Sequence, residues 1–409
     1  MLLHRSKSLA KAVLKPVLGS VEFHRLPAAA KRAARIDAAG LPIFDPGPDA
    51  AIEAAIDWLG RAQDRSPSAD GGVARHYSLT TGWGPSYPET TGYIVPTMLE
   101  QSARRHDAAL RERAQRMLDW LVSIQYPEGG FQGGVIGQAA PVPVTFNTGQ
   151  ILLGLAAGAK TLGERYRGAM RQAADWLANS QDSDGCWRKH RTPFASADDK
   201  SYETHVSWGL FEAARVENNG SWAEAGLRQV RWALTKQRRN GWMEACCLED
   251  TARPLTHTLG YALRGILECW RFSRQEEFLE AGRRLADGLL TALGPQGRLP
   301  GRLRPDWSAG ASWVCLTGTV QIAHSWLILY LETGEEKYRD AGLAANAFVR
   351  RTVAYDGPDD VRGAVKGCFP ADGDYGRFEY LNWAAKFFID SNQAEADLRR
   401  DAPAARSAS

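Results

Sequence analysis

The feature that most constrains this chain is a sequence unit that returns six times. Its clearest copy joins Asp175-Trp176-Leu177, at the end of an amphipathic stretch, to Gln181, Gly185 and Trp187. Equivalent positions fall near residues 57, 119, 175, 231, 287 and 347, at steps of 62, 56, 56, 56 and 60 residues. Self-similarity at a nearly constant step is typical of a repeat architecture, in which each copy is one supersecondary unit.

The other copies carry the same residue types in the same order, with some loss toward the C-terminus. The shared signature is a helical triplet, a glutamine, and a glycine turn. It is found at Asp57-Trp58-Leu59, Gln63 and Gly71; at Asp119-Trp120-Leu121, Gln125 and Gly129; at Trp232, Gln237 and Gly241; and at Asp287, Gln296 and Gly297. An incomplete copy of the signature runs from Phe348 to Gly363 and Gly367.

Each repeat contains two stretches with helical periodicity. The first carries the triplet and has one apolar face, whereas the second is apolar nearly all round. Helices of the second kind are buried, so we place them in an inner ring and the amphipathic helices outside it. The predicted outer helices include 109–125, 165–181, 221–237 and 276–293, and the inner ones are 88–104, 146–161, 202–216, 255–272, 316–333 and 378–391.

This pattern predicts an all-α fold, an (α/α)6 toroid of six helical hairpins that closes on itself. A closed ring of this kind favours one large domain, although the length alone would allow two or three. We expect a basic amphipathic N-terminal extension and linker over residues 1–49, a catalytic toroid over 50–393, and a disordered tail over 394–409.

The N-terminal extension is basic. Residues 1–35 hold eight lysines and arginines against one acid, Glu22, and apolar residues recur between them at mostly helical spacing. Such a segment could lie on anionic lipid, although a frayed tail or a helix packed on the domain is the favoured interpretation. Lacking an apolar run long enough for a membrane span or a signal peptide, the sequence predicts a cytoplasmic protein. Peripheral contact of residues 1–35 with the inner face of a membrane stays open.

Composition argues against several classes of partner. The net charge is +3 and no basic stripe is present, so we expect no nucleic acid. The six cysteines show no CxxC spacing and fall mostly inside helical patterns, as reduced core thiols do. The sequence has no His-Glu-x-x-His motif either, so we predict neither a metal nor a cofactor.

The stretch from Gln181 to Trp187 resembles the Gln/Trp repeat of the terpenoid cyclase and protein prenyltransferase toroids. The glycine loops and the six-hairpin count are similar to those of glycan-active α/α toroids: uronate lyases, unsaturated glucuronyl hydrolases and the helical domain of glucuronyl C5-epimerases. Residues 86–93, Ser-Tyr-Pro-Glu-Thr-Thr-Gly-Tyr, resemble proteins of bacterial exopolysaccharide assembly. The resemblance covers residues 50–391 and implies the fold rather than the reaction. The terpene cyclase motif Asp-x-Asp-Asp and the Asp-x-Cys pair of the prenyltransferase zinc site are missing.

All the long loops join an outer helix to the start of an inner one. One rim of the toroid therefore carries these loops together with six inner-helix N-termini. Each N-terminus presents unpaired N–H groups and a partial positive charge. Because loops of this length are usually functional, we expect an anionic ligand such as a uronate to bind in a cavity at this rim.

Five residues at this rim are candidate catalytic groups: Tyr87, Glu89, Glu203, His205 and His257. Glu89 and Glu203 hold matching places at the inner-helix starts of repeats one and three. Two such carboxylates could cleave a glycosidic bond, although an acid at a helix start also complements the helix dipole. The two histidines titrate near neutral pH, although a buried histidine is more often a core residue.

Removing the proton next to a uronate carboxylate needs a base and a cation that neutralises the carboxylate. We assign proton transfer to Tyr87, His205 and His257, and carboxylate binding to Arg75 and Asn147; Glu89 and Glu203 would orient the sugar or assist. Further substrate-binding candidates share a place in the loops or helix starts of this rim: His76, Trp83, Tyr202, Arg253, Trp313, Tyr375, Glu379 and Asn382.

The sequence thus predicts a carbohydrate-active enzyme that makes or modifies an acidic polysaccharide, with an acidic oligosaccharide or polysaccharide as its partner. The predicted reaction is proton abstraction at C5 of a uronate, as in an epimerase or a lyase. Three alternatives stay open: a glycoside hydrolase with paired glutamates, a terpenoid cyclase or prenyltransferase relative, and a glycan-binding scaffold without catalysis.

Overall fold

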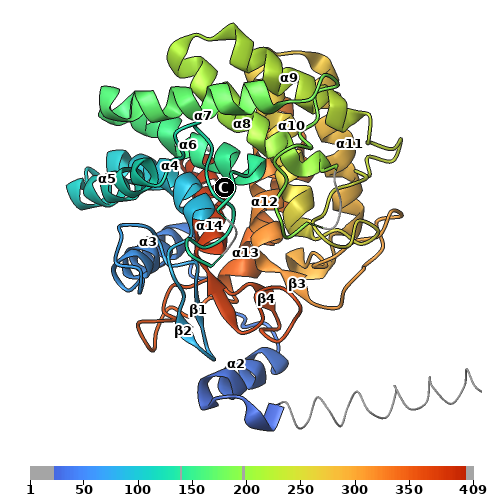
Figure 1. Ribbon diagram of the computed structural model, residues 1–409. Coiled ribbons are helices and arrows are strands. Elements are labelled where there is room, and N and C mark those ends of the chain that lie inside the picture. The colour runs from blue at the N-terminus through green and yellow to red at the C-terminus, as the bar shows by residue number, and fades with distance from the viewer. Residues whose placement is uncertain (1–22, 139–140, 196–198, 402–409) are drawn as a thin grey trace, which may run out of the picture.

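The computed structural model describes residues 23–138, 141–195 and 199–401. In this part of the chain, six inner and six outer helices alternate along the sequence (Figure 1). The inner helices are α4 (Pro88–Arg105), α6 (Thr145–Leu162), α8 (Thr204–Glu217), α10 (Thr256–Ser273), α12 (Leu316–Thr333) and α14 (Asn382–Asp401). The outer helices are α3 (Pro48–Asp64), α5 (Ala108–Ser123), α7 (Arg167–Ser180), α9 (Gly220–Leu234), α11 (Glu276–Ala292) and α13 (Glu336–Arg350). The predicted all-α ring of hairpins is confirmed.

The ring closes between its first and last helices. Each inner helix packs against the two inner helices beside it, and α14 completes the circle by contacting α4. α14 also packs along α3, so the two ends of the toroid form the sixth hairpin. The inner helices approach closely at glycines: a Cβ on Gly209 of α8 would lie 2.5 Å from the carbonyl oxygen of Gly149 on α6.

The repeated glutamine and glycine explain why the outer helices stay in register. The Gln181 side-chain amide donates to the Gly185 carbonyl of its own turn at 3.0 Å and to Ala225 of the next outer helix at 2.8 Å. Gly185 has a φ of 96°, and a Cβ there would lie 2.6 Å from the Arg228 carbonyl oxygen. The last copy closes the ring in the same way, since a Cβ on Gly363 would lie 2.0 Å from the carbonyl oxygen of Ala54.

Short strands tie the long loops together. A three-stranded antiparallel sheet has the order β2 (Gly82–Trp83), β1 (His76–Ser78), β5 (Glu379–Leu381), with His76 opposite Leu381. It joins the first long loop to the last one. A second pair, β3 (Val314–Cys315) with β4 (Cys368–Phe369), joins the fifth and sixth loops. Three 3-10 turns also occur in this part of the chain: η1 (Glu164–Tyr166), η2 (Ser201–Glu203) and η3 (Pro295–Gly297).

Buried ion pairs hold the N-terminal extension on the ring. Helix α2 (Ala28–Ala38) ends near Asp37, a buried carboxylate that accepts from Lys366 Nζ at 2.5 Å and from the backbone N–H of Ala371 at 2.8 Å. The linker follows, and both oxygens of Asp45 accept from Arg350 at 2.7 Å. Of residues 1–35, for which contact with a membrane was predicted, residues 1–22 lie outside the described part.

The prediction of a disordered tail from residue 394 is wrong for residues 394–401, which continue α14. The reason is the fully buried Glu395, whose Oε2 accepts from Arg350 Nη1 at 2.7 Å and from Asn346 Nδ2 at 3.0 Å. A polar sequence is ordered here because its buried acid is paired with a cation. Residues 402–409 lie outside the described part.

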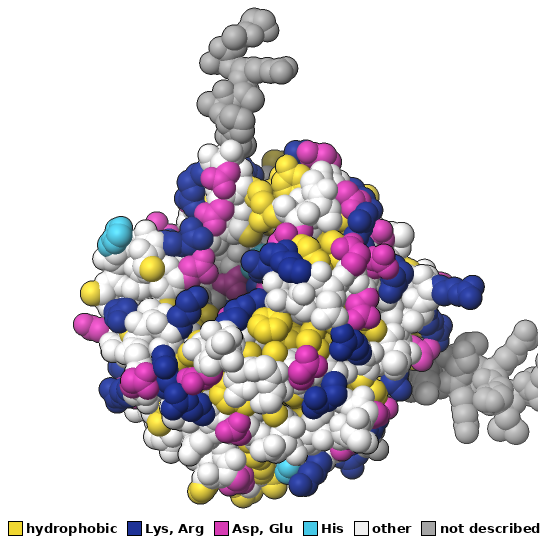
Figure 2. Space-filling model, turned by 90° about the horizontal axis from the view of Figure 1, so that it is seen from above, with side chains coloured by type: hydrophobic (Ala, Val, Ile, Leu, Met, Phe, Trp, Pro, Cys, Tyr) yellow, Lys and Arg dark blue, Asp and Glu magenta, His cyan; other side chains and the backbone are white. Residues whose placement is uncertain are grey.

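The surface and the thiols give few further clues. Basic and acidic side chains are interspersed over the face shown in Figure 2. Within the described ranges, no helix has the length and apolar character needed to cross a bilayer. All six cysteines are buried free thiols, as predicted.

Candidate active site

A cavity of about 200 Å³ lies at the rim where the long loops meet the starts of the inner helices. It is lined by the first two turns of α4 and α10, by the starts of α6 and α14, by η2, and by residues of four loops. Seven of the predicted site residues are among those that line it: Arg75, Tyr87, Glu89, Asn147, Tyr202, His257 and Tyr375. The structure therefore brings together about half of the predicted residues, contributed by several different repeats.

Glu89 is the acid of this cavity. It lies in the first turn of α4, directly after Pro88, and its Oε2 accepts a hydrogen bond from Asn147 Nδ2 at 2.9 Å. Burial raises the pKa of Glu89 to about 7, against the opposing effects of the Arg75 charge and the Asn147 hydrogen bond. A carboxyl with this pKa can both accept and donate a proton at neutral pH. Asn147 thus positions Glu89, and its amide has a second N–H donor, so binding of a substrate carboxylate stays a prediction.

Arg75 is the cation of the cavity. Its guanidinium packs over the ring of Trp383 at 5.2 Å and over that of Tyr87 at 5.9 Å. Its Nη1 lies 2.9 Å from His76 Nδ1 and 3.5 Å from Glu379 Oε2. The two aromatic rings and the two polar neighbours fix a planar fork of donors, which suits a carboxylate ligand.

His257 is held as a neutral imidazole. Its Nδ1 donates to the side-chain carbonyl of Gln321 at 2.7 Å, so Nε2 carries a lone pair. Burial lowers the pKa of His257 to about 4. The tyrosine hydroxyls beside it keep their protons, because burial raises the pKa values of Tyr87 and Tyr261 far above neutral pH. At neutral pH these hydroxyls are therefore protonated and can donate hydrogen bonds, and the proton-transfer role of Tyr87 stays a prediction.

Two predicted catalytic residues, His205 and Glu203, lie outside the cavity. His205 is fully buried beneath it, with Nδ1 2.6 Å from Gln150 Oε1 and its ring against that of Tyr261. Glu203 is 1% exposed and ends η2, ahead of α8. The acid pair proposed for Glu89 and Glu203 is therefore not formed in one cavity.

Six predicted binding residues also lie outside the cavity lining. The Glu379 carboxylate lies near both the Arg75 guanidinium, at 3.5 Å, and His76 Nε2, at 3.8 Å. Asn382 Nδ2 donates to the backbone carbonyl of Ala74 at 3.0 Å. These three position Arg75 and its loop. The remaining three are structural: Trp83 packs on Trp58 and donates to Asp360, Trp313 packs with Leu255 and Cys315, and Arg253 is paired with Asp250 at the surface.

Several aromatic residues of the cavity wall were not predicted from the sequence. Tyr93 and Tyr261 lie one helical turn after Glu89 and His257, so helical spacing from the predicted residues could have identified them. Phe146 directly precedes the predicted Asn147, and Trp383 directly follows the predicted Asn382. Phe194, 57% exposed, comes from the third long loop, and no sequence signal marked it.

A groove of about 390 Å³ continues outward from the cavity. It shares Arg75, Tyr87 and Phe194 with the cavity and extends past Gly134 to Gln138. The cavity and the groove together can take a ring-sized group and its neighbour. Among the described residues, no cluster of three or more His, Cys, Asp or Glu could hold a metal ion.

Comparisons with known proteins agree with this architecture. The family model of the squalene-hopene cyclase C-terminal domain matches residues 88–272. An unsaturated glucuronyl hydrolase specific for heparin superposes with a TM-score of 0.70 at 14% identity, over 86% of this chain and 97% of that one. The chain is an α/α toroid.

Other solved toroids act on small sugars. A D-mannose isomerase superposes with a TM-score of 0.67 at 13% identity, over 88% of this chain and 100% of that one. The cellobiose 2-epimerase of Bacillus thermoamylovorans superposes with a TM-score of 0.66 at 10% identity, over 83% of this chain and 96% of the epimerase. No curated protein matches by sequence. At such low identity, these likenesses establish the fold alone.

Proposed function

We propose that this toroid is a carbohydrate-active enzyme that binds a uronate residue of an acidic glycan in the loop-rim cavity and moves the proton at C5. The observation that carries the proposal is one cavity holding a single carboxyl with a pKa of about 7, Glu89, beside the aromatic-clamped cation Arg75. The similarity to sugar hydrolases, an isomerase and an epimerase supports a glycan substrate by analogy of fold.

The proposed reaction begins with ionised Glu89 as the base. It takes the C5 proton, and the electrons of the C–H bond move into the uronate carboxyl group, where Arg75 stabilises the added charge. Return of a proton to the other face of C5, from a tyrosine hydroxyl of the lining such as that of Tyr261, gives the C5 epimer. Loss of the substituent at C4 gives an unsaturated sugar instead.

The lining argues against hydrolysis by paired carboxylates. That mechanism needs two acids flanking the bond, about 5–10 Å apart. Glu89 is the only Asp or Glu among the described residues that line the cavity, and Glu203, its partner in the alternative prediction, does not reach it. The strongly shifted pKa values also favour an enzyme over a passive glycan scaffold.

A terpenoid reaction is the second candidate, favoured by one specific observation. The matched family model is that of a terpenoid cyclase domain, and eight of the seventeen lining residues are aromatic. Aromatic faces stabilise carbocations, and protonated Glu89 could start such a reaction. The charged Arg75 and the small volume fit a sugar acid better. Incubation with squalene and with isoprenoid diphosphates, followed by mass spectrometry, separates the two candidates, because only the terpenoid candidate predicts a cyclised product.

The test of the proposal is hydrogen exchange at C5. Uronate-containing glycans incubated with the enzyme in D2O should gain deuterium at C5, and Glu89→Gln should stop the exchange. Glu203→Gln is the matched control, since Glu203 holds the same place in repeat three but lies outside the cavity. Equal loss in both variants, or exchange that survives Glu89→Gln, would reject Glu89 as the base.

A further inference from the structure

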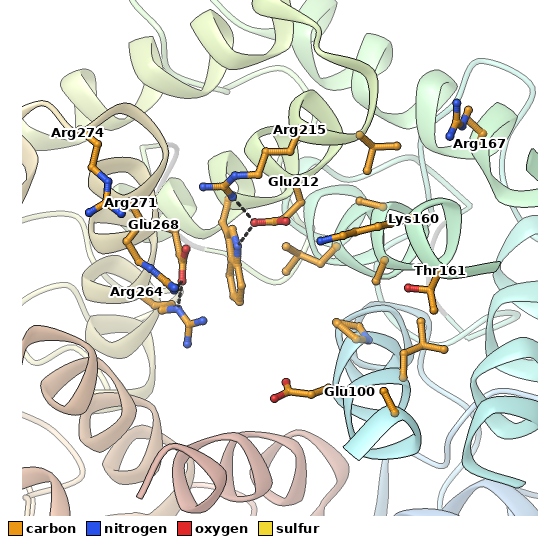
Figure 3. A pocket seen from close by; sticks show the side chains of 18 residues that line it. Glu100, Lys160, Thr161, Arg167, Glu212, Arg215, Arg264, Glu268, Arg271 and Arg274 are labelled. Atoms are coloured by element: carbon orange, nitrogen blue, oxygen red, sulfur yellow. Dashed lines mark hydrogen bonds and ion pairs between the residues drawn. The ribbon is translucent and has the colours of Figure 1, made fainter. Parts of the chain in front are cut away.

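A second and larger cavity, of about 860 Å³, opens at the opposite rim of the toroid. The C-terminal halves of α4, α6, α8 and α10 form its wall, away from the long loops (Figure 3). Six of its eighteen lining residues are basic and three are acidic. The cations are Lys160, Arg167, Arg215, Arg264, Arg271 and Arg274, and the acids are Glu100, Glu212 and Glu268.

Helix ends explain part of this charge. Lys160, Arg215 and Arg271 lie in the last turns of α6, α8 and α10, where cations complement the negative end of the helix dipole. Arg264 lies in the middle of α10 and its side chain is only 12% exposed. A helix dipole gives no reason for a guanidinium at that depth.

Arg264 is held rigidly at the edge of the cavity. Its guanidinium stacks over Trp208 at 4.3 Å, its Nε donates to Glu268 Oε1 at 2.8 Å, and its Nη1 lies 3.1 Å from His324 Nδ1. Burial holds the pKa of His324 well below its ordinary value, so this imidazole is neutral and accepts the bond from Nη1. Nη2 has no hydrogen-bond partner among the residues that the structure describes. Its donors are thus available to a ligand in a fixed orientation.

The arginines at this cavity outnumber the carboxylates that pair with them. Glu268 is shared by Arg264 and Arg271, at 2.8 and 3.0 Å. Glu332 is shared by Arg271 and Arg274, at 3.8 and 3.4 Å. Three arginines therefore share two carboxylates. Arg215, Arg167 and Glu100 have partners of opposite charge in Glu212, Glu217 and Arg104.

Lys160 adds a second uncompensated cation. It forms no ion pair within the described ranges, and Figure 3 shows it directed into the cavity from the side facing Arg264. Together with the arginine surplus, the cavity carries about two positive charges without a protein counterion. A phosphate group carries about −1.5 to −2 charges near neutral pH, with several strong acceptor oxygens. It therefore matches this surplus better than a single carboxylate does.

We infer that this second cavity binds a phosphorylated small molecule, with Arg264 on one side of the cavity and Lys160 on the other contacting its anionic groups. The site is separate from the loop-rim cavity and does not depend on the reaction proposed there. Arg264 supplies oriented donors and Lys160 supplies a mobile charge, as is usual where both cations meet a phosphate.

The test is calorimetric titration of the full chain with inorganic diphosphate, with a sugar phosphate and with glucuronate. Diphosphate and the sugar phosphate should both bind more tightly than glucuronate. Added salt should lower the affinity for both phosphate-containing probes. Lys160→Ala should weaken diphosphate binding about tenfold or more, because a charge-assisted contact is lost. Arg264→Gln should do the same. If that variant unfolds because the buried Glu268 keeps only Arg271 as its partner, the exposed Lys160 still provides the test.

Two control variants distinguish this site from a general effect of surface charge and from the loop-rim cavity. Arg339→Gln removes one positive charge from the exposed face of α13 and should leave diphosphate binding unchanged. Glu89→Gln should also leave it unchanged, whatever it does at the loop rim. The inference is overturned by absence of binding at millimolar diphosphate, or by full affinity in Lys160→Ala. Loss of binding in an Arg75 variant would place the anion in the other cavity and overturn it too.

Discussion

Replacement of Glu203 by glutamine should stabilise the protein, and more so as the pH rises. Glu203 is 1% exposed, and its Oε2 has no hydrogen-bond partner among the described residues. Burial raises its pKa to about 8, against the lowering effect of the Lys200 charge. Glutamine keeps the shape of the side chain and removes its ionisation.

The size of the effect follows from proton linkage. Between the pKa of about 4.5 in the unfolded chain and about 8 in the folded one, the folded protein keeps a proton that the unfolded chain has lost. The unfolded state binds fewer protons, so stability falls as the pH rises, by about 1.4 kcal/mol per pH unit. The free energy of unfolding gained by Glu203→Gln should therefore increase from about 1 kcal/mol at pH 5 to about 3 kcal/mol at pH 7.

Urea unfolding followed by tryptophan fluorescence at pH 5, 6 and 7 measures this gain. Glu224→Gln, an exposed change on α9, is the control and should show little dependence on pH. The opposite sign would refute the reasoning. If Glu203 is ionised in the folded protein and paired with Lys200, the variant should be destabilised by about 3–5 kcal/mol, because a buried cation is left without its partner.

Four further outcomes are expected. Glu89→Gln should lower the rate of C5 exchange about 10²–10⁴-fold. The rate of exchange by the wild-type protein should rise with pH through about 7, because the ionised carboxylate of Glu89 is the base. A rate that stays constant from pH 5 to 9 would contradict this. Arg75→Met should weaken binding of a uronate glycan but not of its carboxyl-reduced form, measured by calorimetric titration. Phe194→Ala should raise KM more for oligosaccharides than for monosaccharides, since Phe194 borders the outer groove as well as the cavity. Removing residues 1–22 should reduce co-sedimentation with anionic vesicles without moving the unfolding midpoint, because the Asp37–Lys366 pair is kept; unchanged sedimentation would leave this segment without a membrane role.

The fold was predictable because its repeat has a physical cause that the sequence displays. In four repeats the glutamine at the outer-helix end bonds the next outer helix, as Gln181 does to Ala225, and the glycine turn fits only without a Cβ. Such contacts recur with the period of the ring. The order of residues 394–401 depends instead on long-range contacts, such as those of Arg350 with Glu395 and of Arg104 with Asp397, which no local pattern reveals.

The sequence predicted at which rim of the toroid the site lies, but not which side chains line it. Glu89 and Glu203 occupy the same register in the repeats, yet only Glu89 reaches the cavity. In repeat one the α-helix begins at Pro88, so Glu89 lies in its first turn; in repeat three it begins at Thr204, and Glu203 lies in η2 ahead of it. A local change from 3-10 to α geometry separates the two acids, and the sequence spacing does not encode it.

The most direct test of the central claim is proton NMR of uronate-containing polysaccharides incubated with the protein in D2O, with Glu89→Gln measured in parallel. The account predicts that wild-type protein introduces deuterium at C5, with an epimer or an unsaturated sugar as the product, and that Glu89→Gln does neither. Folded wild-type protein that leaves C5 unlabelled in every acidic glycan tested would contradict it.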